Sequence, residues 1–368
     1  MNSFGKKICL SMIVKNEAHV IRRCLDSVRP IIDHWIIVDT GSTDGTQDVV
    51  RAVMADVPGT LVERPWVDFA FNRTEALRLS RPHAQYSLII DADDRLIIPE
   101  GFILPKLSAA GYMFTILDEH TKYWRIQLVK NNKDWRYRGV LHEFLECRKD
   151  PPTPTLPLAM HRGNDGARHR DELSERRDLA VLEKALAIEK DPFMVARYTF
   201  YIARSYRDVG DDLKALEYYL KRGDLGYWKE EIYISLLNAA WLMEKFGSPE
   251  HEVLKLYDRV IPICPGRAEA RHSASQYCRR MKNFTAGYRY AEAGLSLAAP
   301  KEGIAIMPWI YEFGLLEEFS IDAYHTGQYR DCGAACLKIL DLSGVPNEVL
   351  SRTADLARLA LVKIAEPA

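Results

Sequence analysis

Short apolar runs alternate with amphipathic stretches through roughly the first 165 residues, and this alternation constrains the fold more than any other feature. Runs rich in β-branched and aromatic residues predict strands at Ile8–Val14, Trp35–Asp39, Thr60–Glu63, Tyr86–Asp91, Tyr112–Leu117 and Trp124–Lys130. Helices are predicted over Glu17–Val28, Asp44–Met54 and Phe71–Leu79. This alternation favours an α/β fold, in which a mostly parallel, Rossmann-like sheet carries helices on both faces. Ligands bind at the carboxyl ends of strands in such sheets, where Asp39 and Asp91 are expected to stand.

The pattern changes near residue 165. Four prolines between residues 151 and 157 interrupt any helix and weaken any central strand. From about Arg168 onward the chain has an almost purely helical pattern. Helix pairs recur with turns near Gly210, Gly247, Asn283 and Gly327, which are 37, 36 and 44 residues apart. This recurrence resembles a tetratricopeptide array, whose usual period is about 34 residues. The longer third spacing implies an insertion around Lys301–Pro308.

The sequence therefore predicts three parts: an α/β domain over residues 1–165, a connecting helix over 166–190, and an all-α tetratricopeptide-like domain over 191–368. An irregular helical bundle is the alternative for the third part. The length of 368 residues and the hydrophobic content of 47% are typical of two domains rather than one.

Composition excludes several classes of function. The formal net charge of −1 gives no indication of a nucleic-acid partner. No apolar run approaches the roughly 20 residues that span a bilayer, so no integral membrane segment is expected. The first apolar run ends at Lys15 and predicts a strand rather than a signal peptide. Seven scattered cysteines without a C-x-x-C pair favour free thiols in a reducing cytoplasm.

An acidic run follows one of the predicted strands. Leu88-Ile89-Ile90 is apolar, and Asp91-Ala92-Asp93-Asp94 follows directly. Residues two apart on a strand share a face, so Asp91 and Asp93 are expected to point the same way. Two carboxylates held together suit a hard divalent ion, Mg²⁺ or Mn²⁺, that also takes phosphate oxygens. The alternative interpretation is an acidic turn that caps the next helix.

Four segments together resemble the family-two glycosyltransferases of the GT-A fold. They are Ser11-Met12-Ile13-Val14-Lys15-Asn16-Glu17, Ile37-Val38-Asp39-Thr40-Gly41-Ser42-Thr43-Asp44-Gly45-Thr46, Phe71-Asn72-Arg73-Thr74-Glu75-Ala76-Leu77 and Asp91-Ala92-Asp93-Asp94. Their order and spacing match over roughly residues 7–165. The segment Tyr137-Arg138-Gly139-Val140-Leu141-His142-Glu143 looks like the G-x-x-H-E segment of the subgroup with a C-terminal tetratricopeptide-like region.

The resemblance implies a nucleotide-sugar donor, most simply a UDP-sugar. A cation held by carboxylates would neutralise the charge that develops on the leaving diphosphate. Asp93 is the expected direct ligand of that ion, while Asp91 binds it through water or accepts a ribose hydroxyl. Asp39 is expected to read the N–H edge of the pyrimidine, and Glu17 to face the nucleoside. Arg73 is the expected cation for the diphosphate.

Two of these residues have simpler alternatives. Glu17 could be a first-turn acid that complements a helix dipole. Arg73 could be a surface arginine of its helix. Relatives often have Arg-Asn where this chain has Arg73-Thr74, so no role is carried over for the second position.

An inverting transfer needs a base that takes the proton of the acceptor as it attacks. Glu143 is the expected base because it stands in the motif-like loop where this fold supplies one. Asp94 and His142 are the alternatives, and a structural salt bridge is a further one. On a regular strand His142 and Glu143 would face opposite sides, so only one would line the site.

Two further features are consistent with a sugar-nucleotide site. His161 precedes a glycine turn, where many GT-A enzymes place a metal or diphosphate contact. Trp124, Trp135 and Tyr137 lie between the acidic run and Glu143. These aromatic side chains could stack on a sugar, although packing in the core is the commoner role.

These features predict a metal-dependent, inverting glycosyltransferase that moves a sugar to a glycan, peptide or protein acceptor. The helical array would bind the acceptor, form a homodimer, or both. A nucleotidyltransferase on a similar sheet is one alternative, although the chain lacks the Gly-rich, basic phosphate loop of that class. The other is a helical-repeat adaptor whose first domain binds a nucleotide without turnover.

Overall fold

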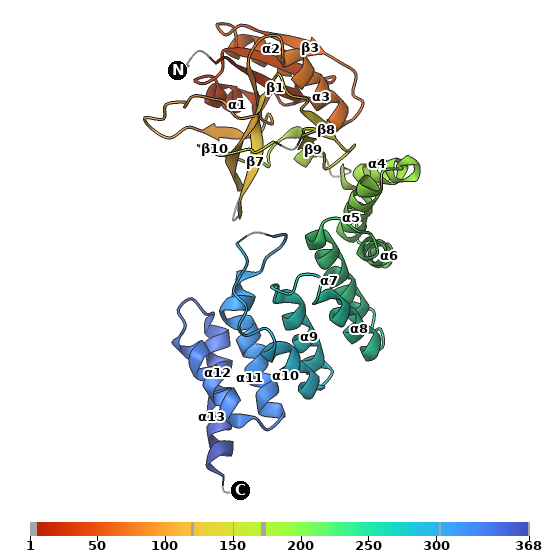
Figure 1. The fold of residues 1–368 in the computed structure, drawn as a ribbon, viewed down its shortest axis with the longest axis vertical. Coiled ribbons are helices and arrows are strands. Elements are labelled where there is room, and N and C mark those ends of the chain that lie inside the picture. The colour runs from red at the N-terminus through yellow and green to blue at the C-terminus, as the bar shows by residue number, and fades with distance from the viewer. Residues whose placement is uncertain (1–5, 119–120, 150, 171–173, 302, 367–368) are drawn as a thin grey trace. The chain divides into compact units, whose positions relative to one another are not determined.

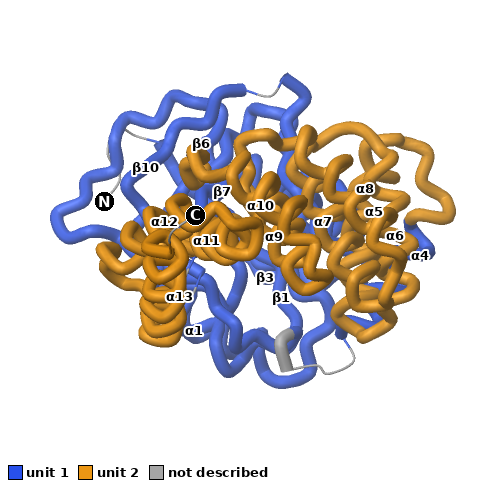
Figure 2. Tube along the Cα trace, turned by 90° about the horizontal axis from the view of Figure 1, so that it is seen from below, with its two compact units in different colours: residues 1–185 blue, residues 186–368 orange. Residues whose placement is uncertain are grey.

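The computed structural model describes residues 6–118, 121–149, 151–170, 174–301 and 303–366. It divides into two compact units, residues 1–185 and 186–368, which Figure 2 colours separately. The division falls inside helix α4 (Ser174–Ile188), within the segment expected to connect the domains.

The first unit is built on a sheet with the strand order β3-β2-β1-β4-β7-β6-β10-β5 (Figure 1). The strands are β1 (Ile8–Val14), β2 (His34–Asp39), β3 (Gly59–Glu63), β4 (Tyr86–Ile89), β5 (Arg95–Ile97), β6 (Gly111–Asp118), β7 (Thr121–Lys130) and β10 (Thr155–His161). The first four strands of that order are parallel to one another, and β10 is parallel to β6. β7 runs antiparallel to both β4 and β6. A small hairpin of β8 (Arg136–Arg138) and β9 (Phe144–Glu146) lies outside this sheet.

Helices cover both faces of the sheet. The alternation of buried residues in β1 explains why, because Leu10 and Met12 pack in one core and Cys9 in the other. The first core includes side chains of α1 (Ile21–Val28) and α2 (Thr46–Val53), and the second includes Ala76 of α3 (Phe69–Ser80). The predicted α/β architecture with a mostly parallel sheet is confirmed.

Two local predictions were wrong in ways that affect the site. β4 ends at Ile89, and the acidic run forms a turn in which the Asp94 amide donates to the Asp91 carbonyl at 3.1 Å. Strand alternation therefore does not set the direction of the Asp91 and Asp93 side chains. α1 begins at Ile21 instead of Glu17. Residues 139–143 form a bend between β8 and β9, in agreement with the loop expected around Glu143.

The second unit is helical throughout its regular structure. Its helices are α5 (Pro192–Asp208), α6 (Asp212–Gly223), α7 (Lys229–Lys245), α8 (Glu250–Val260), α9 (Glu269–Arg280), α10 (Phe284–Glu292), a short π-helical turn η3 (Ile310–Gly314), α11 (Leu315–His325), α12 (Tyr329–Asp341) and α13 (Asn347–Ala365). The turns between paired helices contain a left-handed residue, which is Gly210, Gly247 and Gly327 in three pairs and Lys282 in the fourth. The predicted tetratricopeptide-like pairing of helices is confirmed.

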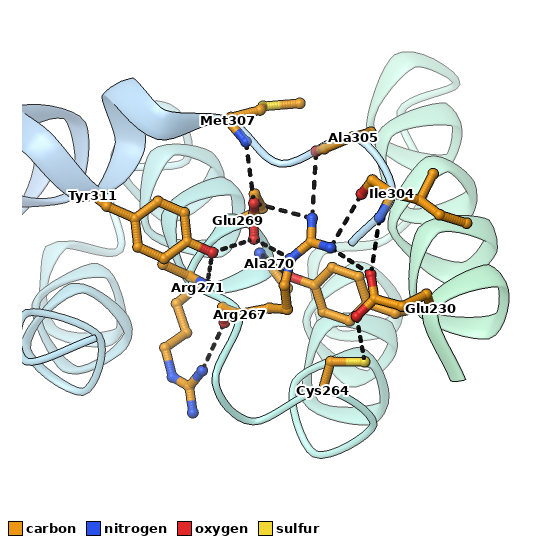
Figure 3. A network of polar contacts seen from close by, with 12 residues as sticks. Glu230, Cys264, Arg267, Glu269, Ala270, Arg271, Ile304, Ala305, Met307 and Tyr311 are labelled. Atoms are coloured by element: carbon orange, nitrogen blue, oxygen red, sulfur yellow. Dashed lines mark hydrogen bonds and ion pairs between the residues drawn. The ribbon is translucent and has the colours of Figure 1, made fainter. Parts of the chain in front are cut away.

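The predicted insertion is fastened to the repeats by one buried arginine (Figure 3). Arg267 makes a two-bond contact with Glu269, at 2.8 and 3.0 Å, and a 2.6 Å contact with Glu230 of α7. It also donates to the Ile304 and Ala305 carbonyls at 3.0 and 3.3 Å. Both Arg267 and Glu269 are almost fully buried. The loop that lengthens the third repeat is thus held by charge-assisted hydrogen bonds, together with the packing of Met307 against the core that includes Phe319.

The described residues also bear on membrane-spanning helices and on the state of the cysteines. None of their helices combines the length and apolar character that crossing a bilayer would take. All seven cysteines are free thiols, as expected, and Cys332 and Cys336 are buried in the second unit.

Replacing Arg267 with Met should destabilise the second unit by about 3–5 kcal/mol, because the buried Glu269 and the partly buried Glu230 would lose their shared positive charge. Among the described residues they would keep only neutral hydrogen-bond donors such as Tyr311 and the Ile304 amide. Arg259→Met is the matched control: Arg259 contacts Asp224, and both side chains are exposed, so its loss should cost no more than about 1 kcal/mol. Hydrogen exchange of peptides from α7 and α9 measures the effect in this unit alone. Equal protection in the two variants would contradict a fastening role for Arg267.

Candidate functional site

The loops that follow β1 and β2 are joined by hydrogen bonds. The Asn16 amide donates to Ser42 Oγ, and the Thr43 amide donates to Asn16 Oδ1, both at 2.8 Å. The Glu17 amide donates to Thr46 Oγ1, also at 2.8 Å. Asn16 has a φ of 60°, a conformation that asparagine tolerates better than most residues. Much of the motif after β2 therefore serves to hold the two loops together beside the strand ends.

Asp39 ends β2, as predicted, and its two carboxylate oxygens differ in their surroundings. Oδ1 accepts from the Gly41 and Ser42 amides, both at 2.8 Å. Oδ2 is buried and has no hydrogen-bond partner among the described residues. Gly41 has a φ of 105°, which only glycine adopts readily, so the turn that supplies the first amide depends on that residue. A buried carboxylate oxygen without a donor is costly unless a ligand supplies one.

Arg73 of α3 lies between two carboxylates. Its Nη2 is 2.7 Å from Asp91 Oδ1, and its Nε is 2.8 Å from Glu143 Oε1, an ion pair in which the N–H is not aligned for a hydrogen bond. The guanidinium also lies 5.6 Å from the centre of the Tyr137 ring. Burial opposes its charge, but the two carboxylates raise the pKa of Arg73 above its usual range. Arg73 is therefore not a surface arginine; it holds the acidic turn and the β8–β9 loop together.

Asp91 and Asp94 titrate differently although they belong to one turn. Burial favours the neutral form of Asp91, but the charge of Arg73 outweighs this effect and lowers the pKa of Asp91. Burial, reinforced by the charge of Asp91, raises the pKa of Asp94 to about 7. Asp94 Oδ1 accepts from the Gly163 amide at 3.0 Å, and Oδ2 is 3.8 Å from Arg125 Nη2. Asp91 is thus held as an anion, whereas Asp94 changes protonation near neutral pH.

The segment 162–168, which we call the strap, lies across the acidic turn. A Cβ on Gly163 would lie 2.2 Å from the Asp93 carbonyl oxygen, and one on Gly166 would lie 2.8 Å from an Asp93 carboxylate oxygen. A side chain at position 163 would collide with the backbone of Asp93, so that position requires glycine; one at position 166 would require the Asp93 carboxylate to shift. Asp165 of the strap forms an ion pair with Arg23 of α1 at 2.8 Å, and Arg23 Nη2 donates to the Asp93 carbonyl at 2.7 Å.

Glu17 is also covered by the strap. Its two carboxylate oxygens accept from the Ala167 amide at 3.3 and 3.2 Å. Burial raises the pKa of Glu17 to about 7, and the nearby Asp93 carboxylate adds to the effect. The alternative role of a first-turn acid is not supported, because α1 begins four residues later at Ile21.

The carboxylates near the turn form no complete cage for a metal ion. Within the described part of the chain, no group of three or more His, Cys, Asp or Glu side chains is arranged to hold one. The expected set of Asp91, Asp93 and His161 is therefore not assembled, since Asp91 is paired with Arg73 and His161 is exposed at the end of β10. Mg²⁺ is commonly held by one or two carboxylates together with substrate phosphates. Asp93 and Glu17, whose charges repel each other, fit that smaller donor set.

The remaining predicted side chains have separate positions. Trp135 is buried in the core with its Nε1 donating to the Ala110 carbonyl at 2.9 Å, so it is a packing residue. Trp124 of β7 is half-exposed, and Tyr137 contacts Arg73. His142 is exposed in the bend with a φ of 50°, and because that segment is no strand, alternation does not exclude it from the side of Glu143.

No motif in the sequence predicts a role for Arg125, Gln127 or the strap. Arg125 stands in a strand-like run with no motif around it, so only its position opposite the end of β4 brings it to the acidic turn. Gly163 and Gly166 were visible as turn residues, but their close approach to Asp93 depends on a contact about 70 residues away in the chain.

Residues 9–98 match the model of the glycosyl transferase family 2. A TPR repeat-containing protein of Synechococcus elongatus is 28% identical over 238 residues, which cover 59% of this chain and 56% of that protein. The SPbeta prophage-derived glycosyltransferase SunS of Bacillus subtilis is 23% identical over 242 residues, covering 60% and 54%. The chain thus spans a little over half the length of these relatives. A crystal structure of a tetratricopeptide repeat protein from Parabacteroides merdae aligns with a TM-score of 0.39 at 15% identity, covering 54% of this chain and 77% of that one.

The raised pKa of Asp94 predicts a pH-dependent effect on stability. In the folded state Asp94 keeps its proton up to about pH 7, whereas the unfolded carboxyl loses it near 3.8. Its contribution to stability is therefore present at low pH and is lost as the pH rises toward 7. Between pH 5 and pH 8, Asp94→Asn should gain on the order of 2 kcal/mol of unfolding free energy relative to wild type. Urea denaturation at both pH values measures this.

Asp48→Asn, which changes an exposed carboxylate of α2, is the control and should track wild type. A constant difference between Asp94→Asn and wild type across this range would show that Asp94 ionises normally.

Proposed function

We propose that this protein transfers a sugar from a UDP-sugar to a glycan, peptide or protein acceptor, with inversion and with the help of Mn²⁺ or Mg²⁺. The observation that carries the proposal is the unpaired, buried Oδ2 of Asp39 at the carboxyl end of β2. It stands inside the segment that matches the glycosyl transferase family 2 model.

Asp39 is the proposed reader of the nucleobase. A carboxylate oxygen accepts hydrogen bonds only, and the N3 position of uracil is an N–H donor. The corresponding atom of cytosine is an acceptor and would face the carboxylate without a hydrogen. Because Oδ2 is shielded from water, the side chains that cover it must turn aside when the base enters. Glu17, in the neighbouring loop, would face the nucleoside.

The binding test uses UDP and CDP with Mn²⁺ present. Wild type should bind UDP about 10- to 100-fold more tightly than CDP, the value of one charge-assisted hydrogen bond and its loss. Asp39→Asn presents an amide N–H group to the base, so it should lose UDP affinity and narrow or reverse the preference. Titration calorimetry measures the dissociation constants of UDP and of CDP for each protein. Equal affinity of wild type for UDP and CDP would remove Asp39 from this role.

The proposed cation would be held by Asp93 and by diphosphate oxygens, with Asp91 contributing through water or accepting a ribose hydroxyl. When bound, Mn²⁺ or Mg²⁺ supplies Lewis-acid neutralisation of the leaving diphosphate. Glu17 lies close enough to Asp93 to sense its charge and would favour a cation between them. His161 remains a candidate for the outer part of the site because it ends β10 next to the strap.

Glu143 is the proposed base. Arg73 holds its carboxylate at 2.8 Å and thereby limits the directions that the second oxygen can take. The acceptor oxygen, nitrogen or sulfur would give its proton to Glu143 as it attacks the anomeric carbon. Asp94 and His142 remain the alternatives, and Asp94 has a pKa suited to a base near neutral pH.

The helical repeats are proposed to bind the acceptor or to form a homodimer. Stacked helix pairs present extended surfaces that suit peptides and proteins. The nucleotidyltransferase alternative predicts release of pyrophosphate, and the adaptor alternative predicts nucleotide binding without turnover.

An assay of UDP release from a panel of UDP-sugars tests the reaction. Turnover should require Mn²⁺ or Mg²⁺ and cease in excess EDTA. Glu143→Gln should lower turnover by about 10²- to 10⁴-fold, because the base is lost, while leaving UDP affinity unchanged. Arg136→Gln, on the β8–β9 hairpin but paired with Glu146, is the matched control and should keep full activity. Undiminished turnover in EDTA would reject the cation, and loss of UDP affinity in Glu143→Gln would reject the base assignment.

A further inference from the structure

The cation expected to meet the diphosphate, Arg73, is already engaged. Asp91 and Glu143 each lie within 2.8 Å of its nitrogens, and its side chain is 14% exposed. The Tyr137 ring covers part of the guanidinium. A phosphate that bound Nη2 or Nε of Arg73 would have to displace Asp91, which is 33% exposed, or Glu143, which is 14% exposed. The displaced carboxylate would then lose its positive partner.

A second arginine, Arg125, reaches the same acidic turn from β7, the strand that pairs with β4. Arg125 lies on β7, which runs past the end of β4: Leu88 pairs with Leu128, so Arg125 extends beyond the last residues of β4. Its side chain is 44% exposed, and its only ion pair in the described residues is the 3.8 Å contact with Asp94. That distance is too long for a hydrogen bond.

Arg125 is nevertheless held in a defined direction. Gln127 is 1% exposed, and its side-chain oxygen accepts from Arg125 Nη2 at 2.9 Å in the amide orientation that satisfies both ends. In that orientation its nitrogen donates to the Ile126 carbonyl at 2.9 Å. A buried glutamine thus orients an exposed arginine toward the acidic turn, and the other donors of Arg125 have no hydrogen-bond partner among the described residues.

Arg162 provides a second positive charge at this edge of the sheet. It follows β10 directly, its amide donates to the Leu117 carbonyl at 2.9 Å, and its side chain is half-exposed. Arg162 contacts Asp118 at 2.8 Å, and its charge acts on both Asp91 and Asp94. The exposed face of the site therefore carries two arginines, while the buried one stands behind the carboxylates.

We propose that Arg125, assisted by Arg162, binds the diphosphate of the donor, and that Arg73 is a positioning residue for Asp91 and Glu143. The inference rests on the proposed function. A guanidinium fork matches two phosphate oxygens, and an incoming dianion replaces the loose contact with Asp94 by direct hydrogen bonds.

The test compares UDP with uridine, which lacks the diphosphate, by titration calorimetry with Mn²⁺ present throughout. Arg125→Gln should lower UDP affinity at least tenfold and leave uridine affinity unchanged. Arg125→Lys keeps the charge but not the fork, so it should lose about threefold or more. Arg136→Gln, an exposed arginine of β8, is the control and should match wild type.

The variant Arg73→Lys tests whether Arg73 positions the carboxylates or binds the diphosphate itself. A positioning role predicts a lower kcat with UDP affinity within about twofold of wild type, whereas a diphosphate ligand would lose UDP affinity. If Arg125→Gln fails to fold, Arg125→Lys decides by the same comparison. Unchanged UDP affinity in the folded Arg125 variants would overturn the inference. Wild type that binds UDP no more tightly than uridine would instead refute the proposed function itself.

Discussion

The paired contact of Arg73 with Asp91 and Glu143 is the interaction on which the site depends. It joins α3, the turn after β4 and the bend between β8 and β9, three segments that are far apart in the chain. A guanidinium is charged at every relevant pH, so its burial is tolerable only with carboxylates at hydrogen-bonding distance. The two carboxylates in turn tolerate each other's proximity only because Arg73 lies between them. Each of the three segments is therefore placed by the other two.

Further pairs of opposite charge surround the contact of Arg73 with its two carboxylates. Asp94 faces Arg125, and Asp165 of the strap pairs with Arg23. The pairs become more exposed in that order away from Arg73, and exposed pairs exchange partners at little cost. A diphosphate and a cation could therefore enter by replacing the outer contacts while the inner one keeps the geometry. The charge of Asp93 adds to the burial that raises the pKa of Glu17, which is consistent with the proposal of a cation close to this pair.

The second unit also contains an arginine placed between two carboxylates, Arg267 with Glu230 and Glu269. Arg267 holds the inserted loop against α7 and α9, and Met307 of the loop packs against the helical core. The carbonyls of Ile304 and Ala305 both accept from Arg267, whose guanidinium has five donors. The insertion is thereby ordered without a helix of its own.

The sequence by itself determined the alternation of strands and helices, the change to helical repeats and the place of Asp39 at the end of β2. These features follow from the periodicity of two residues in strands and 3.6 residues in helices, and from turn residues. Both signals are carried by residues that are close to one another in the sequence. It did not determine that Asp91–Asp94 is a turn, that Arg73 faces inward, or that Arg125 faces the acids. Those properties depend on contacts between segments 18 to 70 residues apart, such as Arg73 with Asp91 and Gly163 with Asp94. Only the tertiary structure decided them, because the direction of a charged side chain is set by the partner that folding brings to it.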